Sequence, residues 1–200
     1  MKDFFKAFLA GIFIGIAGIV SLKANNYLSP FIFSTGLICI ILCNLKLYTG
    51  IIGVSNDIRE IVLVILGNFL GASIVGEMVN PDPSIELMLQ LKLDKSYIIL
   101  LVTAIFCGML MYVATVVSKE CNNRVLVIIL CVAAFIIGGF EHSVADVFYF
   151  AIDGISSRDL WTLLIIALGN YIGAKTLHLA TSIDSIPLKI NKVRGIRKIR

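Results

Sequence analysis

The residues best suited to chemistry stand together between Gly138 and Asp146. Their order is Gly-Gly-Phe-Glu-His-Ser-Val-Ala-Asp, and the flanking ranges Cys131–Ile137 and Val147–Ile152 are uncharged. Glycine weakens a helix, and an ionised side chain at the bilayer centre costs about 2.5–3.5 kcal/mol on insertion scales. Such residues persist at membrane depth where a helix breaks around a cavity. The stretch therefore predicts the polar centre of a membrane pore.

The rest of the chain supplies the spans that would hold this centre. Of its 200 residues, 58% are hydrophobic and 15% are charged, which excludes an ordinary soluble domain. Apolar runs long enough to cross a bilayer recur along the chain, so we predict an all-α membrane protein with a single channel domain over residues 1–200. The predicted spans are Phe4–Val20, Pro30–Val54, Ile61–Val79, Tyr97–Val117, Val125–Ile152 and Leu160–Ile183.

The distribution of basic residues predicts the orientation. With six spans both termini lie on one side, and the segments on that side carry eleven basic residues against four in the opposite loops. The positive-inside rule then places both termini in the cytoplasm and the chain in the inner (plasma) membrane. The basic tail, residues 185–200, is expected to touch anionic lipid, and we predict no nucleic-acid partner.

An internal repeat organises the spans. The sequence from Gly67 to Ala72 matches that from Gly169 to Ala174 at an offset of 102 residues, with four identical positions. Three spans per half is an odd number, so the halves, about 1–95 and 96–184, would enter the membrane in opposite orientations. The alternative is two unrelated small-residue packing motifs.

The repeat pairs the fifth span with the second, which is disrupted at Asn44–Gly50. Two facing breaks would bring Thr49 and His142 to one small cavity, with free backbone N–H groups at the start of each second half. Hydrogen-bond donors suit a small anion, and an imidazole can lend a proton near neutral pH. Glu141 is expected to bind backbone N–H groups or to hold the loop, since an acid lining the path would repel an anion.

An enzyme is the rival class. A metal site needs several ligands at close spacing, and His142 and His178 stand in different spans. A Ser143–His142 pair lacks a third member, and no GxxxxGK[ST] loop is present. We predict no enzyme, no metal and no cofactor, with a membrane enzyme or a pore-less assembly subunit as the alternatives.

At these residues the chain resembles the formate/nitrite transporter family. GFEHSVA at Gly139–Ala145 is similar to that family's fifth-span motif, LYTG at Leu47–Gly50 to its second-span loop, and Gly169–Asn170 to its sixth-span motif. The resemblance covers essentially the whole chain. It implies an aquaporin-like fold with broken second and fifth helices, a homopentamer with one pore per protomer, and passage of hydrosulfide, formate or nitrite.

The resemblance also implies roles for single residues. Carried over by position, they are a central site of His142, Thr49 and Asn170, an outer constriction of Phe33, Leu37 and Phe135, an inner constriction of Leu47 and Met111, and a basic vestibule residue, Lys92. Ordinary packing or lipid contact is the alternative for the outer ring.

The chain departs from the family pattern at Asn44, Lys46, Tyr48 and Gly108, where the family usually has a glycine nearby, an acid, a phenylalanine and an asparagine. We expect Gly108 to widen the inner path and to remove a polar ligand. These departures make the sequence most similar to the hydrosulfide channel branch. The alternative is a formate or nitrite channel or proton symporter.

Overall fold

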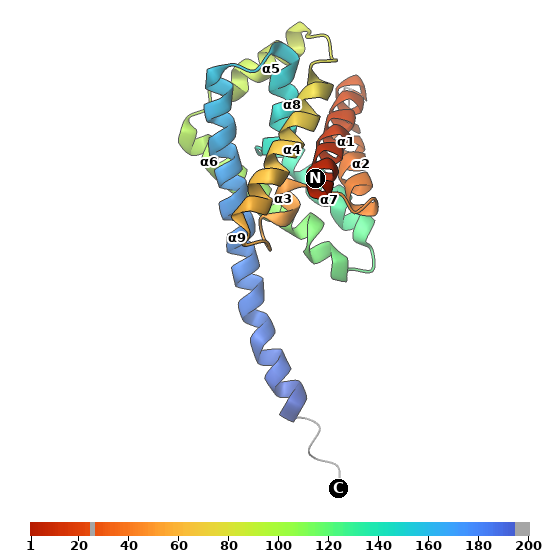
Figure 1. The fold of residues 1–200 in the computed structure, drawn as a ribbon, viewed down its shortest axis with the longest axis vertical. Coiled ribbons are helices and arrows are strands. Elements are labelled where there is room, and N and C mark those ends of the chain that lie inside the picture. Colours follow the sequence, from red (N-terminus) through yellow and green to blue (C-terminus); the bar gives the residue numbers. More distant parts are fainter. Residues whose placement is uncertain (25–26, 195–200) are drawn as a thin grey trace.

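The computed structural model describes residues 1–24 and 27–194, with the backbone alone for 183–194, and the described part is helical without strands. The elements are α1 (Lys2–Ala24), α2 (Ser29–Leu42), α3 (Tyr48–Ile51), α4 (Ile58–Gly76), α5 (Pro83–Leu93), α6 (Tyr97–Thr115), the 3-10 helix η1 (Val117–Glu120), α7 (Arg124–Ile137), α8 (Ser143–Asp153) and α9 (Ser157–Arg194). They form one upright bundle, with α5 at the end opposite the C-terminus (Figure 1).

Four of the described helical segments are long and apolar enough to cross a bilayer unaided: α1, α4, α6 extended through η1, and α9 as far as Ser182. Helices α2 and α7 have 14 residues each and are too short to cross alone. Each is continued by a second piece, α3 and α8 respectively. The predicted fold, with broken second and fifth helices, is therefore present. Helix α9 continues past the predicted end at Ile183, and the side chains of the basic tail lie outside the described residues.

The break after α7 is built by its two glycines. Gly139 has a φ of 63°, in the left-handed region that favours glycine. The Phe140 N–H donates to the Phe135 carbonyl at 2.9 Å, and the Gly139 N–H donates to the Ile136 carbonyl at 3.1 Å. This pair of bonds is the Schellman motif, which ends a helix and satisfies its last carbonyl groups. The helix thus stops at membrane depth without leaving these carbonyls unpaired.

The break after α2 has the same design with a different residue. Asn44 takes the left-handed conformation, with a φ of 51°, and asparagine tolerates that region better than other non-glycine residues. The Leu45 N–H donates to the Ile40 carbonyl at 2.9 Å, and the Asn44 N–H to the Ile41 carbonyl at 3.2 Å. Asn44 therefore supplies the left-handed residue that ends α2.

Helix α5 lies between the predicted third and fourth spans, where the sequence pattern predicted no span. Asp82 caps it by accepting from the Ser84 and Ile85 N–H groups, and Pro83 stands in its first turn. The hydrogen bonds from Ser84 and Ile85 hold the pKa of Asp82 below its usual range. An Asp-Pro pair at a helix start was a usable signal. Ile85 and Leu89, one turn apart, are buried against the bundle, so α5 packs on the membrane domain.

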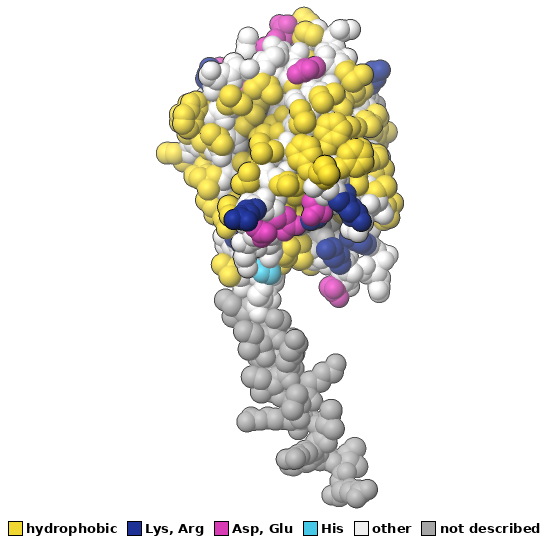
Figure 2. Space-filling view, viewed as in Figure 1, with side chains coloured by type: hydrophobic (Ala, Val, Ile, Leu, Met, Phe, Trp, Pro, Cys, Tyr) yellow, Lys and Arg dark blue, Asp and Glu magenta, His cyan; other side chains and the backbone are white. Residues whose placement is uncertain are grey.

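Apolar side chains cover the outside of the bundle. Figure 2 shows a broad apolar band over one face, with charged side chains gathered mainly beyond its two ends. The exposed apolar side chains include Val62, Leu66, Leu70 and Ile74 on α4, and Leu160, Leu164 and Leu168 on α9. Such a continuous band exceeds what a monomer in water normally exposes and suits lipid or another subunit.

Two pairs of helices cross at glycines in equivalent ways. A Cβ on Gly11 of α1 would collide with the backbone carbonyl of Asn68 on α4, and a Cβ on Gly108 of α6 would collide with that of Asn170 on α9. The expectation that Gly108 widens the inner path was therefore wrong. The space left by its missing side chain is filled by the α9 backbone, as at small-residue crossings in other membrane helices.

Gly108→Ala and Gly11→Ala should each destabilise the protein by about 1–3 kcal/mol or more, because backbone must move to admit the new carbon. The matched control is Gly50→Ala, whose Cβ would lie 3.4 Å from the Thr115 side chain, an ordinary contact. Thermal unfolding in detergent measures all three. Unfolding of Gly108→Ala at the wild-type temperature would show that α6 and α9 are not in close contact there.

Candidate functional site

Thr49 and His142, which the sequence places 93 residues apart, are in direct contact. Thr49 Oγ1 lies 3.0 Å from His142 Nε2, and both residues are buried, with 1% and 2% of their surface exposed. Thr49 stands in the short helix α3 and His142 immediately precedes α8. The two breaks therefore meet at this pair.

The hydrogen bonds of His142 assign its tautomer. Its Nδ1 accepts from the Ala145 N–H at 3.1 Å, capping α8, and a backbone N–H can only donate. The neutral ring then carries its proton on Nε2, which donates to Thr49 Oγ1. Protonating Nδ1 as well would break the cap. The site therefore presents a neutral donor, and the geometry favours hydrogen bonding over the proton lending expected from the sequence.

Three backbone amides at the start of α8 already have partners. The Ser143 N–H donates to the Asn170 side chain at 3.0 Å, the Ala145 N–H to His142 Nδ1, and the Asp146 N–H to the His142 carbonyl at 2.8 Å. The expectation that free N–H groups here would meet an anion was wrong for these three amides. These three amides are therefore not free to bind an anion.

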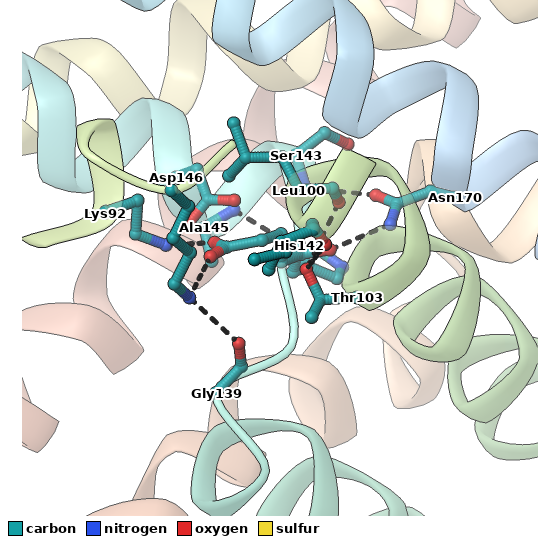
Figure 3. Close-up of polar contacts among 12 residues, drawn as sticks. Lys92, Leu100, Thr103, Gly139, His142, Ser143, Ala145, Asp146 and Asn170 are labelled. Atoms are coloured by element: carbon teal, nitrogen blue, oxygen red, sulfur yellow. Dashed lines mark hydrogen bonds and ion pairs between the residues drawn. The ribbon is translucent and has the colours of Figure 1, made fainter. Parts of the chain in front are cut away.

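Asn170 holds the backbone on both sides of His142. Its Oδ1 accepts from the Ser143 N–H, and its Nδ2 donates to the Glu141 carbonyl at 2.9 Å and to the Ala104 carbonyl at 2.8 Å. These bonds tie the loop to α9 and α6, and Asn170 is fully buried. In Figure 3 Asn170 lies on the opposite side of His142 from Lys92. Asn170 therefore positions His142 through the backbone.

Asn68 does the same at the first break. Its Oδ1 accepts from the Tyr48 N–H at 2.6 Å, and its Nδ2 donates to the Lys46 carbonyl at 2.9 Å and to the Ala7 carbonyl at 2.7 Å. Each asparagine of the repeated Gly-Asn sequence thus binds the first amide of the helix after the break, one carbonyl of the loop that precedes that helix, and one carbonyl of a neighbouring helix. Unrelated packing motifs would not produce this equivalence.

Aromatic rings stand next to His142. The Phe135 ring stacks on the imidazole with centroids 5.6 Å apart, and Phe33 meets Phe135 edge-on at 6.0 Å. Leu37 is buried one turn after Phe33 on α2. The structure therefore brings Phe33 and Phe135 together beside His142 and buries Leu37 in the same core.

The residues assigned to the inner constriction are also buried. Leu47 immediately precedes α3 and Met111 lies on α6, with 3% and 1% of their surface exposed. Both belong to the main hydrophobic core that includes Phe33 and Phe135. They therefore surround the break region with apolar atoms.

A cavity of about 430 Å³ leads from α5 to the central site, and we call it the α5 cavity. Residues that line it include Phe33, Met88, Lys92, Phe135, His142 and Asp146. The predicted vestibule residue Lys92 thus opens onto the same space as His142. This cavity connects the surface near α5 with the imidazole.

Lys92 lies inside an ion-pair cluster. Its ammonium contacts the Glu141 carboxylate and lies 2.5 Å from Asp146 Oδ1, while Lys95 Nζ donates to Glu141 at 2.7 Å. Glu141 therefore holds the loop by binding two lysines, whereas backbone binding falls to Asn170. Burial by itself would lower the pKa of Lys92, but Asp146 and Glu141 outweigh it and raise that pKa above its usual range. Lys92 stays charged across the physiological pH range.

Two other departures from the family pattern have structural partners. The Lys46 ammonium lies 2.7 Å from Glu60 and 3.1 Å from Asp3, so it links the starts of α4 and α1. The Tyr48 hydroxyl donates to the Ala167 carbonyl at 2.9 Å. Both contacts anchor the first break.

The predicted site omitted Asn68, Lys95 and Asp146. The repeat offset was a sufficient signal for Asn68, since it aligns with Asn170. The spacing of Asp146, four residues after His142, indicated a shared helical face but not its partner. Lys95 carried no signal because its contact depends on how α5 folds back. Among the described residues, no three His, Cys, Asp or Glu side chains come close enough to hold a metal.

Asn170→Ala should unfold at a much lower temperature than wild type, because it leaves three buried backbone groups without partners at about 1–3 kcal/mol each. Asn68→Ala should behave alike, since its contacts are equivalent. Asn122→Ala is the control, because Asn122 is exposed. Stability of Asn170→Ala equal to that of the control would refute its role in holding the break.

Known proteins are similar to this chain in sequence and in fold. The family model described as "Formate/nitrite transporter" matches residues 1–182. Formate channel FocA of Escherichia coli (strain K12) is 25% identical over 235 residues, covering 98% of this chain and 82% of that protein.

Two solved structures are similar. An "FNT family ion channel" matches with a TM-score of 0.80 and 20% identity, over 92% of this chain and 90% of that one. A "Pentameric formate channel with formate bound" matches with a TM-score of 0.73 and 22% identity, over 94% of this chain and 97% of that one. Because its family comprises channels and transporters, the chain is a membrane transport protein, and the enzyme alternative is set aside. The chain belongs to the formate/nitrite transporter family.

Proposed function

We propose that this protein is a channel for small monovalent weak-acid anions, with the path crossing each protomer at Thr49 and His142. The observation that carries the proposal is the hydrogen bond between these side chains at the meeting point of the two broken helices. An ionisable residue is costly to bury at membrane depth, and where one occurs it usually marks the path of a substrate or ion.

The pair offers donors to an anion. With Nε2–H donating to Thr49 Oγ1, the threonine hydroxyl proton is directed elsewhere, and the structure gives it no acceptor among the described residues. An arriving anion would accept a hydrogen bond from the Thr49 hydroxyl. If it replaced Thr49 Oγ1 as the acceptor of the His142 Nε2–H, it would gain a second hydrogen bond. Both donors are neutral, so binding stays weak enough for the anion to leave, as conduction requires.

Apolar rings would flank this site. We assign the constriction on the α5 side to Phe33, Leu37 and Phe135, and the opposite one to Leu47 and Met111. Their burial in one core supports the assignment, since a bare anion loses its hydration there at high cost. A weak acid avoids part of that cost by crossing with its proton.

Hydrosulfide is the proposed first substrate, with formate or nitrite as the alternative. The side chains in direct contact at the centre offer one imidazole N–H and one hydroxyl, and a single sulfur atom needs fewer donors than the two oxygens of a carboxylate. Gly108 gives no support to this preference, because it packs against Asn170. Two of the three similar proteins are named as formate channels, which favours the alternative.

We further propose that the chain forms a homopentamer in the inner (plasma) membrane with cytoplasmic termini. The similar structure titled as a pentameric formate channel supports the assembly. The exposed apolar band supplies surface for both lipid and neighbouring protomers. The excess of basic residues in the segments facing one side supports the orientation.

Liposomes that contain the purified protein should swell fastest in hydrosulfide, more slowly in formate and nitrite, and least in chloride. Chloride is the anion of a strong acid, so it cannot cross in a protonated form at neutral pH. Swelling by light scattering measures the rates, with protein-free liposomes as the control. Faster swelling in formate would establish the alternative substrate, and no swelling in any of the four would contradict the channel.

His142→Leu should lower this flux by about 10- to 100-fold, because a lost hydrogen bond to an anion is worth about 1.5–3 kcal/mol. His142→Asn keeps an N–H donor and should retain more flux than the leucine variant, with the wild-type pH dependence. The other histidine in the sequence provides the matched control, His178→Asn.

Wild-type flux in His142→Leu would rule out the central role of the imidazole. A changed pH dependence in His142→Asn would instead restore the proton-lending role that the tautomer argues against.

A further inference from the structure

Asp146 stands beside the path without a role in the proposed conduction step. It lies in the first turn of α8, one turn after His142, and 2% of its surface is exposed. One carboxylate oxygen, Oδ1, lies 2.5 Å from Lys92 Nζ. The other, Oδ2, is buried without a hydrogen-bond partner among the described residues. A carboxylate this deep must have its charge matched by a nearby group.

The charges at the α5 cavity balance. Lys92 and Lys95 contribute two positive charges, and Glu141 and Asp146 contribute two negative charges through direct ion pairs. In Figure 3 Lys92 and Asp146 lie together on one side of His142. Without the charge of Asp146, Glu141 would be the one carboxylate paired with the two lysines, and the cluster would carry one net positive charge.

The other titratable groups near Asp146 do not disturb this balance. They are His142, which is held as the neutral tautomer, Tyr149 on the same helix, and the Cys107 thiol on α6. A phenol and a thiol have ordinary pKa values of about 10 and about 8.5, so both are mainly neutral in the physiological pH range. The charge at this end of the path is therefore decided by the two lysines and the two carboxylates.

We propose that Asp146 is a specificity-determining residue, which cancels the positive charge that Lys92 would otherwise present to the α5 cavity. The inference rests on the proposed channel function. Without net attraction, this mouth does not concentrate anions, so the neutral conjugate acid is admitted on equal terms with its anion. Replacing the carboxylate by an amide would turn the cavity into an anion-attracting funnel.

The physical basis is electrostatic focusing. A cleft of one charge sign between low-dielectric walls raises the local concentration of the opposite ion by a factor of ten or more, and added salt removes the effect. Lys92 remains protonated because its carboxylate neighbours raise its pKa. A variant lacking only the Asp146 charge would therefore show the full positive field.

The test measures initial formate flux into proteoliposomes at about pH 8, where carboxylates are usually ionised, at ionic strengths of about 20 and about 500 mM. Asp146→Asn should raise the flux by about tenfold at low ionic strength. At high ionic strength the flux of this variant should fall toward the wild-type value. Lys92→Met combined with Asp146→Asn restores the charge balance and should return to the wild-type rate and salt dependence. Asp153→Asn, an exposed position at the far end of α8, should match wild type.

An Asp146→Asn flux equal to or below wild type at low salt, in a protein that assembles normally, would overturn the proposal. The wild-type protein provides a second check that needs no variant. Its formate flux should change little with salt, and a steep fall would show a positively charged mouth and also overturn the proposal. A wild-type protein that passes no weak acid would remove the proposed function, and this inference with it.

Discussion

The structure depends on one constraint: a helix interrupted inside a membrane leaves backbone N–H and C=O groups that water cannot satisfy. Here each interruption is closed by a Schellman motif and by a buried asparagine. Asn170 pairs with the amide and the carbonyl that flank His142, and Asn68 does the same around Leu47. Because both asparagines also bind a neighbouring helix, the position of each break is tied to the crossing of α1 with α4 and of α6 with α9.

Satisfying the backbone decides what the site offers to a substrate. Three of the first amides of α8 are occupied, so these three do not bind an anion directly. One of them, the Ala145 N–H, instead occupies His142 Nδ1 and leaves the proton on Nε2. The same interactions that make the break tolerable therefore turn the imidazole into a neutral donor aimed at Thr49. Aromatic stacking by Phe135 keeps the ring in that orientation.

Most of the fold and the central pair were predictable from local patterns. Glycines inside an apolar run indicated the break at Gly138, and the repeated Gly-Asn motif indicated that Thr49 and His142 would meet. What escaped prediction depends on contacts between distant segments. The partners of Glu141 are Lys92 of α5 and Lys95, which follows that helix, and the space beside Gly108 is filled by the Asn170 backbone. Neither spacing nor hydropathy carries that information.

The central claim is that His142 serves the path as a neutral imidazole with its proton on Nε2. Solid-state nitrogen-15 NMR of histidine-labelled protein in lipid tests it directly, with His178→Asn leaving a single labelled ring. We expect one protonated and one unprotonated ring nitrogen, with the proton on Nε2, between about pH 6 and pH 8. An imidazolium in that range, or a proton on Nδ1, would contradict the account.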